Sequence, residues 1–121
     1  MITVMQGLPS GVLGLRAEGE VTAADYTAVV VPAIEAAVAG DARASLLYVL
    51  DDGAGYDAGA LWEDTKVGMH HLSSLDRMAV VTDDGRYRTA VTLMGAFLPG
   101  RVKVFGHAEL DAATAWAAGT G

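Results

Sequence analysis

The stretches SLLYVLDDGAG, residues 45–55, and MAVVTDDG, residues 78–85, decide the fold of this chain. Each is an apolar run that ends in two aspartates and a glycine, and a segment with helical spacing, residues 61–72, lies between them. The order of strand, acidic loop, helix and strand is typical of a βαβ unit. Parallel strands joined in this way end at the same edge of the sheet, where open α/β folds bind their ligands. We therefore expect both acidic loops to meet at one edge.

Two strands and a helix are expected before this unit. Residues 2–5 and 12–21 alternate between apolar and polar side chains, and the short turn between them predicts an antiparallel hairpin. Thr22 is a good N-cap for a helix that ends near Gly40. Pro32 lies inside the apolar stripe of that helix, so we expect a kink or a restart near it.

A helix, a strand and a second helix follow the unit. Helical spacing covers residues 87–98 and residues 110–117, and the alternating residues 101–105 between them predict a strand near an edge. The whole order is ββαβαβαβα. It predicts an α/β fold in a single domain, residues 1–121, with a five-stranded, mostly parallel sheet, an antiparallel N-terminal hairpin and helices on both faces.

Composition restricts the classes of function. The 121 residues contain no cysteine, which excludes a disulfide framework, a thiolate zinc site and a thiol nucleophile. The N-terminal residues do not resemble a signal peptide, and no apolar run is long enough to span a membrane, so we expect a cytoplasmic protein. A net charge of −7 argues against a nucleic-acid partner.

The charge is unevenly distributed along the chain. Residues 65–105 carry six basic and three acidic side chains, a balance of +3. This segment could form a basic surface for an anionic ligand or headgroup. The alternative is an ordinary solvated face.

Several strings, taken together in their order and spacing, resemble the SpoIIAA-like family, which is related to STAS domains and similar in fold to CRAL-TRIO lipid-binding domains. They are Asp25-Tyr26, Pro32-Ala33-Ile34-Glu35, Trp62-Glu63-Asp64, Lys66, Gly68, His71, Arg77, Ala79-Val80-Val81, Asp83, Val104-Phe105, Glu109, Ala113 and Trp116. The resemblance implies the five-stranded sheet described above and says little about activity. STAS proteins that antagonise anti-sigma factors carry a phosphorylatable serine in the loop after the third strand. That loop here is Asp51-Asp52-Gly53-Ala54-Gly55 and has no hydroxyl, so we do not expect a phosphorylation switch.

The first candidate site is the acidic cluster of Asp51, Asp52, Asp83 and Asp84. Clustered carboxylates suit Mg²⁺ or Ca²⁺, and close carboxylates can raise one another's pKa for acid–base chemistry. The alternative is that these residues bond local backbone amides in turns or cap the following helix.

The second candidate is a zinc site that draws on Glu63, Asp64, His70, His71 and His107. Asp64 and His71 are seven residues apart, whereas ligand pairs on a helix normally lie three or four apart. The alternative is surface histidines near the C-terminus of a helix.

The third candidate is an anion or headgroup site. Lys66 and Trp62 would act with Arg77 and the Arg86-Tyr87-Arg88 string, and the amides that open a helix at Gly85 would add positive potential. The alternative is that Lys66 pairs with Glu63 and that Trp62 is packed core.

We expect a non-enzymatic binding or regulatory module, because no string announces a nucleophile with a base in reach. The expected ligand is a protein partner or a small amphipathic, anionic, lipid-like molecule, and no cofactor is expected. The predicted ligand-binding residues are Asp51, Asp52, Trp62, Lys66, Asp83, Gly85 and Arg86. The alternative is a metal-dependent enzyme that uses Asp51, Asp52 and Asp83. A homodimer could form through an edge offered by the second or the fifth strand.

Overall fold

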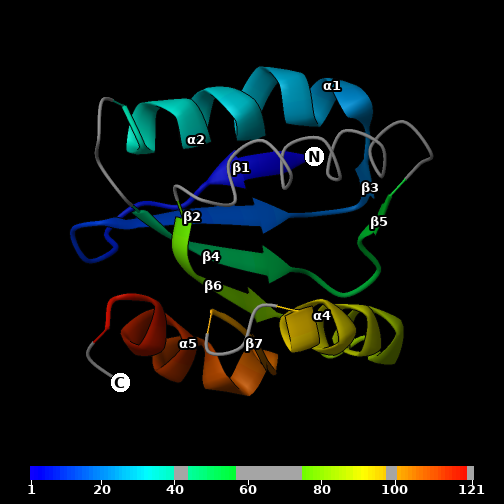
Figure 1. Ribbon diagram of the computed structural model, residues 1–121. Coiled ribbons are helices and arrows are strands. Elements are labelled where there is room, and N and C mark those ends of the chain that lie inside the picture. Colours follow the sequence, from blue (N-terminus) through cyan, green and yellow to red (C-terminus); the bar gives the residue numbers. More distant parts are fainter. Residues whose placement is uncertain (40–43, 57–74, 98–100, 120–121) are drawn as a thin grey trace.

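A five-stranded sheet forms the centre of the protein (Figure 1). The computed structural model describes residues 1–39, 44–56, 75–97 and 101–119. The strands lie in the order β1-β2-β4-β6-β7, and their bounds are Ile2–Val4, Val12–Ala17, Ala44–Leu50, Leu75–Val81 and Val102–Phe105. Only the β1–β2 pair is antiparallel; the other neighbours run parallel. The predicted mixed sheet with its N-terminal hairpin is confirmed.

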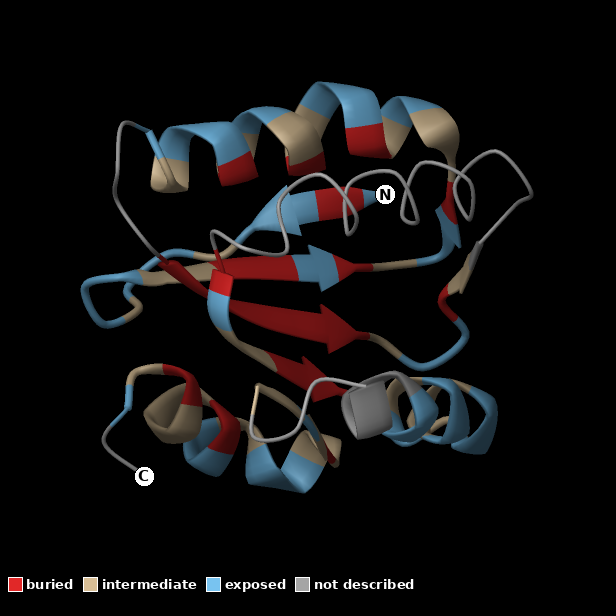
Figure 2. Cartoon of the chain, in the orientation of Figure 1, coloured by how far each residue is buried: buried red, intermediate tan, exposed pale blue. Residues whose placement is uncertain are grey.

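Helices cover both faces of the sheet. On one face, α1 (Ala23–Asp25) leads into η1 (Tyr26–Val30) and α2 (Val31–Ala37), and these two pack with part of α4 (Gly85–Phe97) on the inward side chains of β2, β4 and β6. On the other face, α5 (Leu110–Ala117) packs on β4, β6 and β7. All seven residues of β4 are buried, as Figure 2 shows for the middle of the sheet. The continuous apolar run predicted this central position correctly.

The second strand was expected to be a possible edge for a dimer, and this is wrong. β2 lies between β1 and β4, and the edges of the sheet are β1 and β7. Its alternation has another cause. Gly14 and Arg16 lie on the face of β2 that is turned away from α2. Met5 and Leu8 cover Gly14 so closely that a Cβ atom there would lie 2.2 Å from Leu8 Cδ1. Arg16, on the same face, is exposed.

The first helix has the irregularity predicted near Pro32. Thr22 and Asp25 form a reciprocal capping box, and the chain then makes a π-helical stretch, η1, before continuing as α2. The Val31 N–H bonds Tyr26 O, five residues back. Because Pro32 has no N–H and its ring crowds the preceding turn, the wider π turn lets the helix continue through it.

A small second sheet lies beyond the carboxyl ends of β2 and β4. β3 (Glu20–Val21) pairs in parallel with β5 (Gly55–Tyr56), so the predicted single strand over residues 12–21 is in fact two. Gly19, with a φ of +59°, turns the chain between them. Its carbonyl accepts a hydrogen bond from Gly55 N, which attaches the loop after β4 to the end of β2.

The helix predicted over residues 61–72 lies outside the described residues. Within the part of the chain that the structure describes, no helix is long and apolar enough to cross a membrane.

Candidate functional site

The carboxyl ends of three adjacent strands meet at one edge of the sheet. Register pairs align Val49 with Val81 and Val81 with Phe105, so β4, β6 and β7 finish side by side. The next residues carry the acidic loops, as the sequence predicted for parallel strands. In Figure 1 this is the edge at which α4 begins and beside which β3 and β5 lie.

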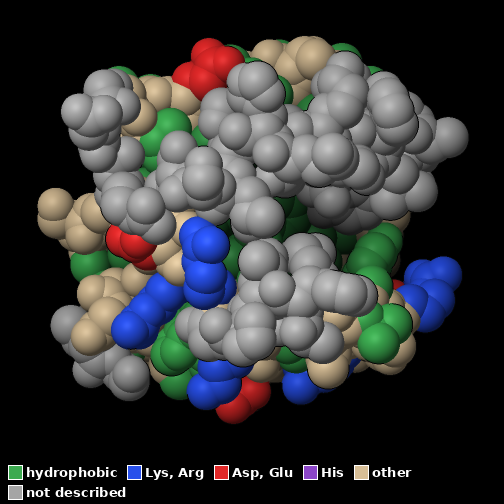
Figure 3. All heavy atoms as spheres, viewed as in Figure 1, with side chains coloured by type: hydrophobic (Ala, Val, Ile, Leu, Met, Phe, Trp, Pro, Cys, Tyr) green, Lys and Arg blue, Asp and Glu red, His purple; other side chains and the backbone are tan. Residues whose placement is uncertain are grey.

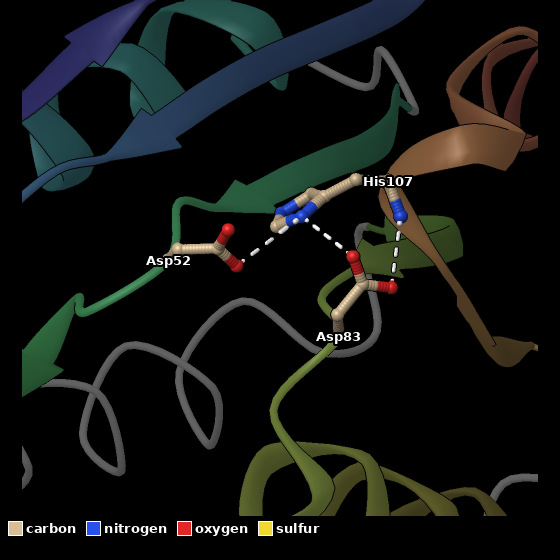
Figure 4. Close-up of side chains that lie close together, drawn as sticks. All are labelled: Asp52, Asp83 and His107. Carbon is tan, nitrogen blue, oxygen red and sulfur yellow. Dashed lines mark hydrogen bonds and ion pairs between the residues drawn. The ribbon is translucent and has the colours of Figure 1, made fainter.

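The histidine that follows β7 joins two of the four aspartates (Figure 4). His107 Nδ1 lies 2.9 Å from Asp83 Oδ2 and 3.6 Å from Asp52 Oδ1. The backbone N–H of His107 also donates to Asp83 Oδ1, at 3.2 Å. Asp52, Asp83 and His107 each stand two residues beyond the end of their strand. We call these three residues the edge triad.

The other nitrogen of His107 fixes the orientation of its ring. Nε2 lies 2.6 Å from the carbonyl oxygen of Leu50, the last residue of β4. A carbonyl can only accept, so Nε2 carries a proton and Nδ1 is the atom turned toward the carboxylates. The side chain of His107 is 28% exposed, whereas those of Asp83 and Asp52 are 56% and 89% exposed.

Asp51 lies outside the edge triad. Its Oδ1 accepts a hydrogen bond of 2.9 Å from Arg16 Nε on the neighbouring strand β2. This hydrogen bond and the attraction between the two charges raise the pKa of Arg16, and Glu18 adds to the effect. Asp51 therefore neutralises a cation of β2, although the sequence grouped it with Asp52 and Asp83.

Asp84 caps α4, as the alternative interpretation of the acidic cluster proposed. Its Oδ1 accepts from Arg86 N at 2.9 Å, and its Oδ2 pairs with Arg86 Nη2 at 3.2 Å. The side chain of Arg86, followed by its backbone N–H, holds the pKa of Asp84 below its usual value. The helix N-terminus at Gly85, predicted to attract an external anion, already has a carboxylate of this chain.

The basic side chains of residues 75–105 also contact groups of the chain itself. Figure 3 shows most of the Lys and Arg side chains in view over the lower half of the molecule, where Figure 1 places α4, β7 and α5. Their partners are Trp116 O and the Trp116 ring for Arg77, Asp84 for Arg86, Thr82 O for Arg88, the carbonyls of Leu75 and Asp76 for Arg101, and the Phe105 ring for Lys103. These cationic side chains therefore interact largely with groups of the chain itself.

Six residues of the predicted candidate sites lie outside the described residues. They are Trp62, Glu63, Asp64, Lys66, His70 and His71. The structure therefore tests neither the part of Lys66 and Trp62 in the predicted anion site nor the helical part of the zinc candidate.

His107 is the one residue of the edge triad whose place the sequence analysis missed. It was grouped with the histidines at residues 70 and 71 because all are possible zinc ligands. The better signal was its position, directly after the strand that ends at Phe105 and hence at the same edge as the acidic loops.

A glycine makes room for the edge triad. A Cβ atom at Gly106 would lie 2.9 Å from Asp83 Oδ1, closer than such atoms normally approach. The N–H of Gly106 donates to Glu109 Oε1 at 2.8 Å, which holds this backbone in place at the start of η3 (His107–Glu109). Asp83 can reach His107 because residue 106 has no side chain.

Comparisons with known proteins agree with this fold. The chain resembles the crystal structure of an uncharacterised protein of the DUF3478 family from Shewanella loihica, which has a SpoIIAA-like fold. The sequences are 26% identical, the TM-score is 0.76, and the match covers 97% of this chain and 92% of the other. No curated protein matches the sequence. The pattern of the SpoIIAA-like family matches residues 12–118. The chain belongs to the SpoIIAA-like family.

Proposed function

We propose that this protein is a non-enzymatic binding or regulatory module that binds a protein partner at the carboxyl edge of its sheet. The observation that carries the proposal is the arrangement of charges there. Asp51, Asp52, Asp83 and Asp84 come from two strand ends, and each is held by a cationic or histidine side chain of the chain itself. Such pairs give a polar surface with a defined arrangement of charges, which suits recognition of another protein.

The chemistry of the same residues favours binding over catalysis. A general acid or base works best with a pKa near the operating pH, whereas Arg86 lowers the pKa of Asp84. Thr82 carries a hydroxyl directly before the acidic loop that follows β6; this residue is 1% exposed and its hydroxyl accepts a hydrogen bond from Asp84 N. That hydroxyl is poorly placed to act as a nucleophile.

A protein partner fits this edge better than a small amphipathic anion. Of the residues expected to bind an anion, Arg86 already binds Asp84 through its side chain and its backbone amide, while Lys66 and Trp62 lie outside the described residues. The most exposed charge of the edge triad is the carboxylate of Asp52, at 89%. Basic side chains opposite Asp52 would complement it, as charged surfaces do across protein interfaces.

Site-specific crosslinking in the cells that naturally produce the protein tests this proposal. A photoreactive residue at position 52 should capture one discrete partner, and the same residue at Glu35, exposed on α2, serves as the matched control. The proposal fails if position 52 yields no discrete product or the same products as position 35. Native mass spectrometry of the purified protein tests the lipid-like ligand instead, since a stoichiometric bound lipid would replace the protein partner in our proposal.

A metal-dependent enzyme is the second candidate, and the edge triad is the observation that favours it. The ligand set differs from the one that the sequence indicated, because Arg16 holds Asp51 while His107 stands beside Asp52 and Asp83. An enzyme of this kind should show metal-dependent turnover that Asp83→Asn abolishes and Asp51→Asn retains.

A further inference from the structure

We propose that the edge triad of Asp52, Asp83 and His107 binds a divalent transition-metal cation such as Zn²⁺. The ligand atoms would be one oxygen of each carboxylate and Nδ1 of His107. These atoms lie within 4.8 Å of one another. The proposal can be tested without the proposed partner, with purified protein and the metal alone.

The distances from His107 Nδ1 to the two carboxylate oxygens fit a small cation. With Zn–N and Zn–O distances of about 2.0–2.1 Å, neighbouring ligands of a tetrahedral ion lie about 3.4 Å apart. The 3.6 Å from His107 Nδ1 to Asp52 Oδ1 is close to this value, and the 2.9 Å to Asp83 Oδ2 has to lengthen by a few tenths of an ångström. Because Asp52 and Asp83 are both well exposed, their side chains can make this adjustment.

Further hydrogen bonds, one to Leu50 and one within the triad, orient two of the three ligands. His107 Nε2 donates to Leu50 O, and a ligating histidine usually donates its second N–H to a carbonyl or carboxylate in this way. Asp83 uses its other oxygen, Oδ1, to accept from the backbone N–H of His107. Figure 4 shows the ring edge turned toward both carboxylates. The arrangement thus has the outer contacts of a metal site in addition to the ligands.

Charge gives a second reason for a cation at this point. Nδ1 of His107 faces the carboxylates of Asp52 and Asp83, which bring two negative charges close to one point. Among the described residues, Arg16 binds Asp51 and Arg88 binds Thr82 O, both outside the triad. A divalent ion would balance the two carboxylates of the triad directly.

The donor set also selects the class of metal. Imidazole with carboxylates suits Zn²⁺, Mn²⁺, Co²⁺ or Ni²⁺, whereas Mg²⁺ and Ca²⁺ prefer oxygen ligands throughout. Three protein ligands on an exposed edge leave the remaining positions of the ion to water or to a group from a partner.

The experiment titrates the full chain, purified without a histidine tag and treated with a chelator, with Co²⁺ and then Zn²⁺. We expect one Co²⁺ per chain, with visible absorption bands of low coordination number that Zn²⁺ removes. Asp52→Asn and His107→Gln should each weaken binding at least tenfold. Asp51→Asn is the matched control, since it removes a carboxylate of the same loop that lies outside the triad, and it should leave the affinity unchanged.

A double variant, His70→Gln with His71→Gln, should also bind normally, because neither residue belongs to the triad. Circular dichroism of each metal-free variant confirms folding, and Asp52→Asn changes the most exposed member, so its result can be interpreted even if His107→Gln unfolds. Absence of stoichiometric binding by Co²⁺ and Zn²⁺ would overturn the proposal. Binding that survives Asp52→Asn but is lost on replacing His70 and His71 would overturn it equally.

Discussion

His107 offers the sharpest test of the edge geometry, through the stability of the metal-free protein. Its imidazole bonds Leu50 O at the end of β4 and Asp83 beyond the end of β6, so His107→Ala removes two links between strand ends. The bond to the carbonyl contributes about 1–1.5 kcal/mol. The link to Asp83 contributes about 0.5 kcal/mol, because that carboxylate is largely exposed and water screens the pair.

The expected loss is therefore about 1.5–2 kcal/mol in the free energy of unfolding. For a chain of this length, 1 kcal/mol corresponds to about 4 °C in Tm, which gives a decrease of about 6–8 °C. Urea and thermal unfolding followed by circular dichroism, with a chelator present, measure both quantities. Asp52→Asn is the control and should stay within about 0.5 kcal/mol of the wild type.

A double-mutant cycle of His107→Ala with Asp83→Asn isolates the link between these two residues and should give a coupling of about 0.5 kcal/mol. If His107→Ala unfolds with the same free energy as the wild type, the ring does not bond Leu50 O in solution. The orientation of Nδ1, and with it the proposed metal site, would then lose its basis.

Three further predictions concern other parts of the structure. Gly106→Ala should weaken Zn²⁺ binding by about tenfold, because the new Cβ displaces Asp83; unchanged affinity would contradict this. Leu47→Ala, at a fully buried position of β4, should lower the free energy of unfolding in urea by about 2–5 kcal/mol. A decrease below about 1 kcal/mol would contradict this, because it would mean that the neighbouring side chains fill the cavity. Asp25→Asn should destabilise the protein at neutral pH. The bond from Thr22 N lowers the pKa of Asp25 in the folded state, so this contribution exists above its unfolded pKa of about 3.9 and is lost as pH falls through the lower folded value. Wild type and variant should converge in acid, and a constant difference would refute the assignment.

The fold was predictable because the strands at the centre of the sheet are buried on both faces and therefore have the clearest sequence pattern. β4 is covered on both faces, so its apolar run is continuous and its end at Leu50 is marked by charge. The break between β2 and β3 was not predictable from alternation, which continues through the break. It depends on the positive φ of Gly19, and a glycine in a strand pattern does not by itself specify a turn.

The location of the candidate site was predictable from the sequence, but which side chains pair with one another there was not. Parallel strands put the two acidic loops together, yet Asp51 and Asp52 have different partners although they are adjacent in sequence. Asp51 directly follows β4 and meets Arg16 of β2, whereas Asp52 lies in the turn that the bond from Ala54 N to Asp51 O closes, and it meets His107 beyond β7. Which residue of such a pair faces which neighbour depends on the course of the loop, and sequence spacing does not define it.

His107 spans the ends of three strands, because it follows β7, bonds the last residue of β4 and pairs with the residue beyond β6. A cation at Nδ1 would therefore act on all three loops at once. It would also neutralise Asp52, the charge that a basic partner would meet first. If both proposals hold, the cation and the partner both contact Asp52, so each must change the affinity of the protein for the other by the same factor. A partner captured at position 52 should then dissociate more readily with Zn²⁺ present, unless it supplies a ligand to the ion, in which case Zn²⁺ should strengthen the complex.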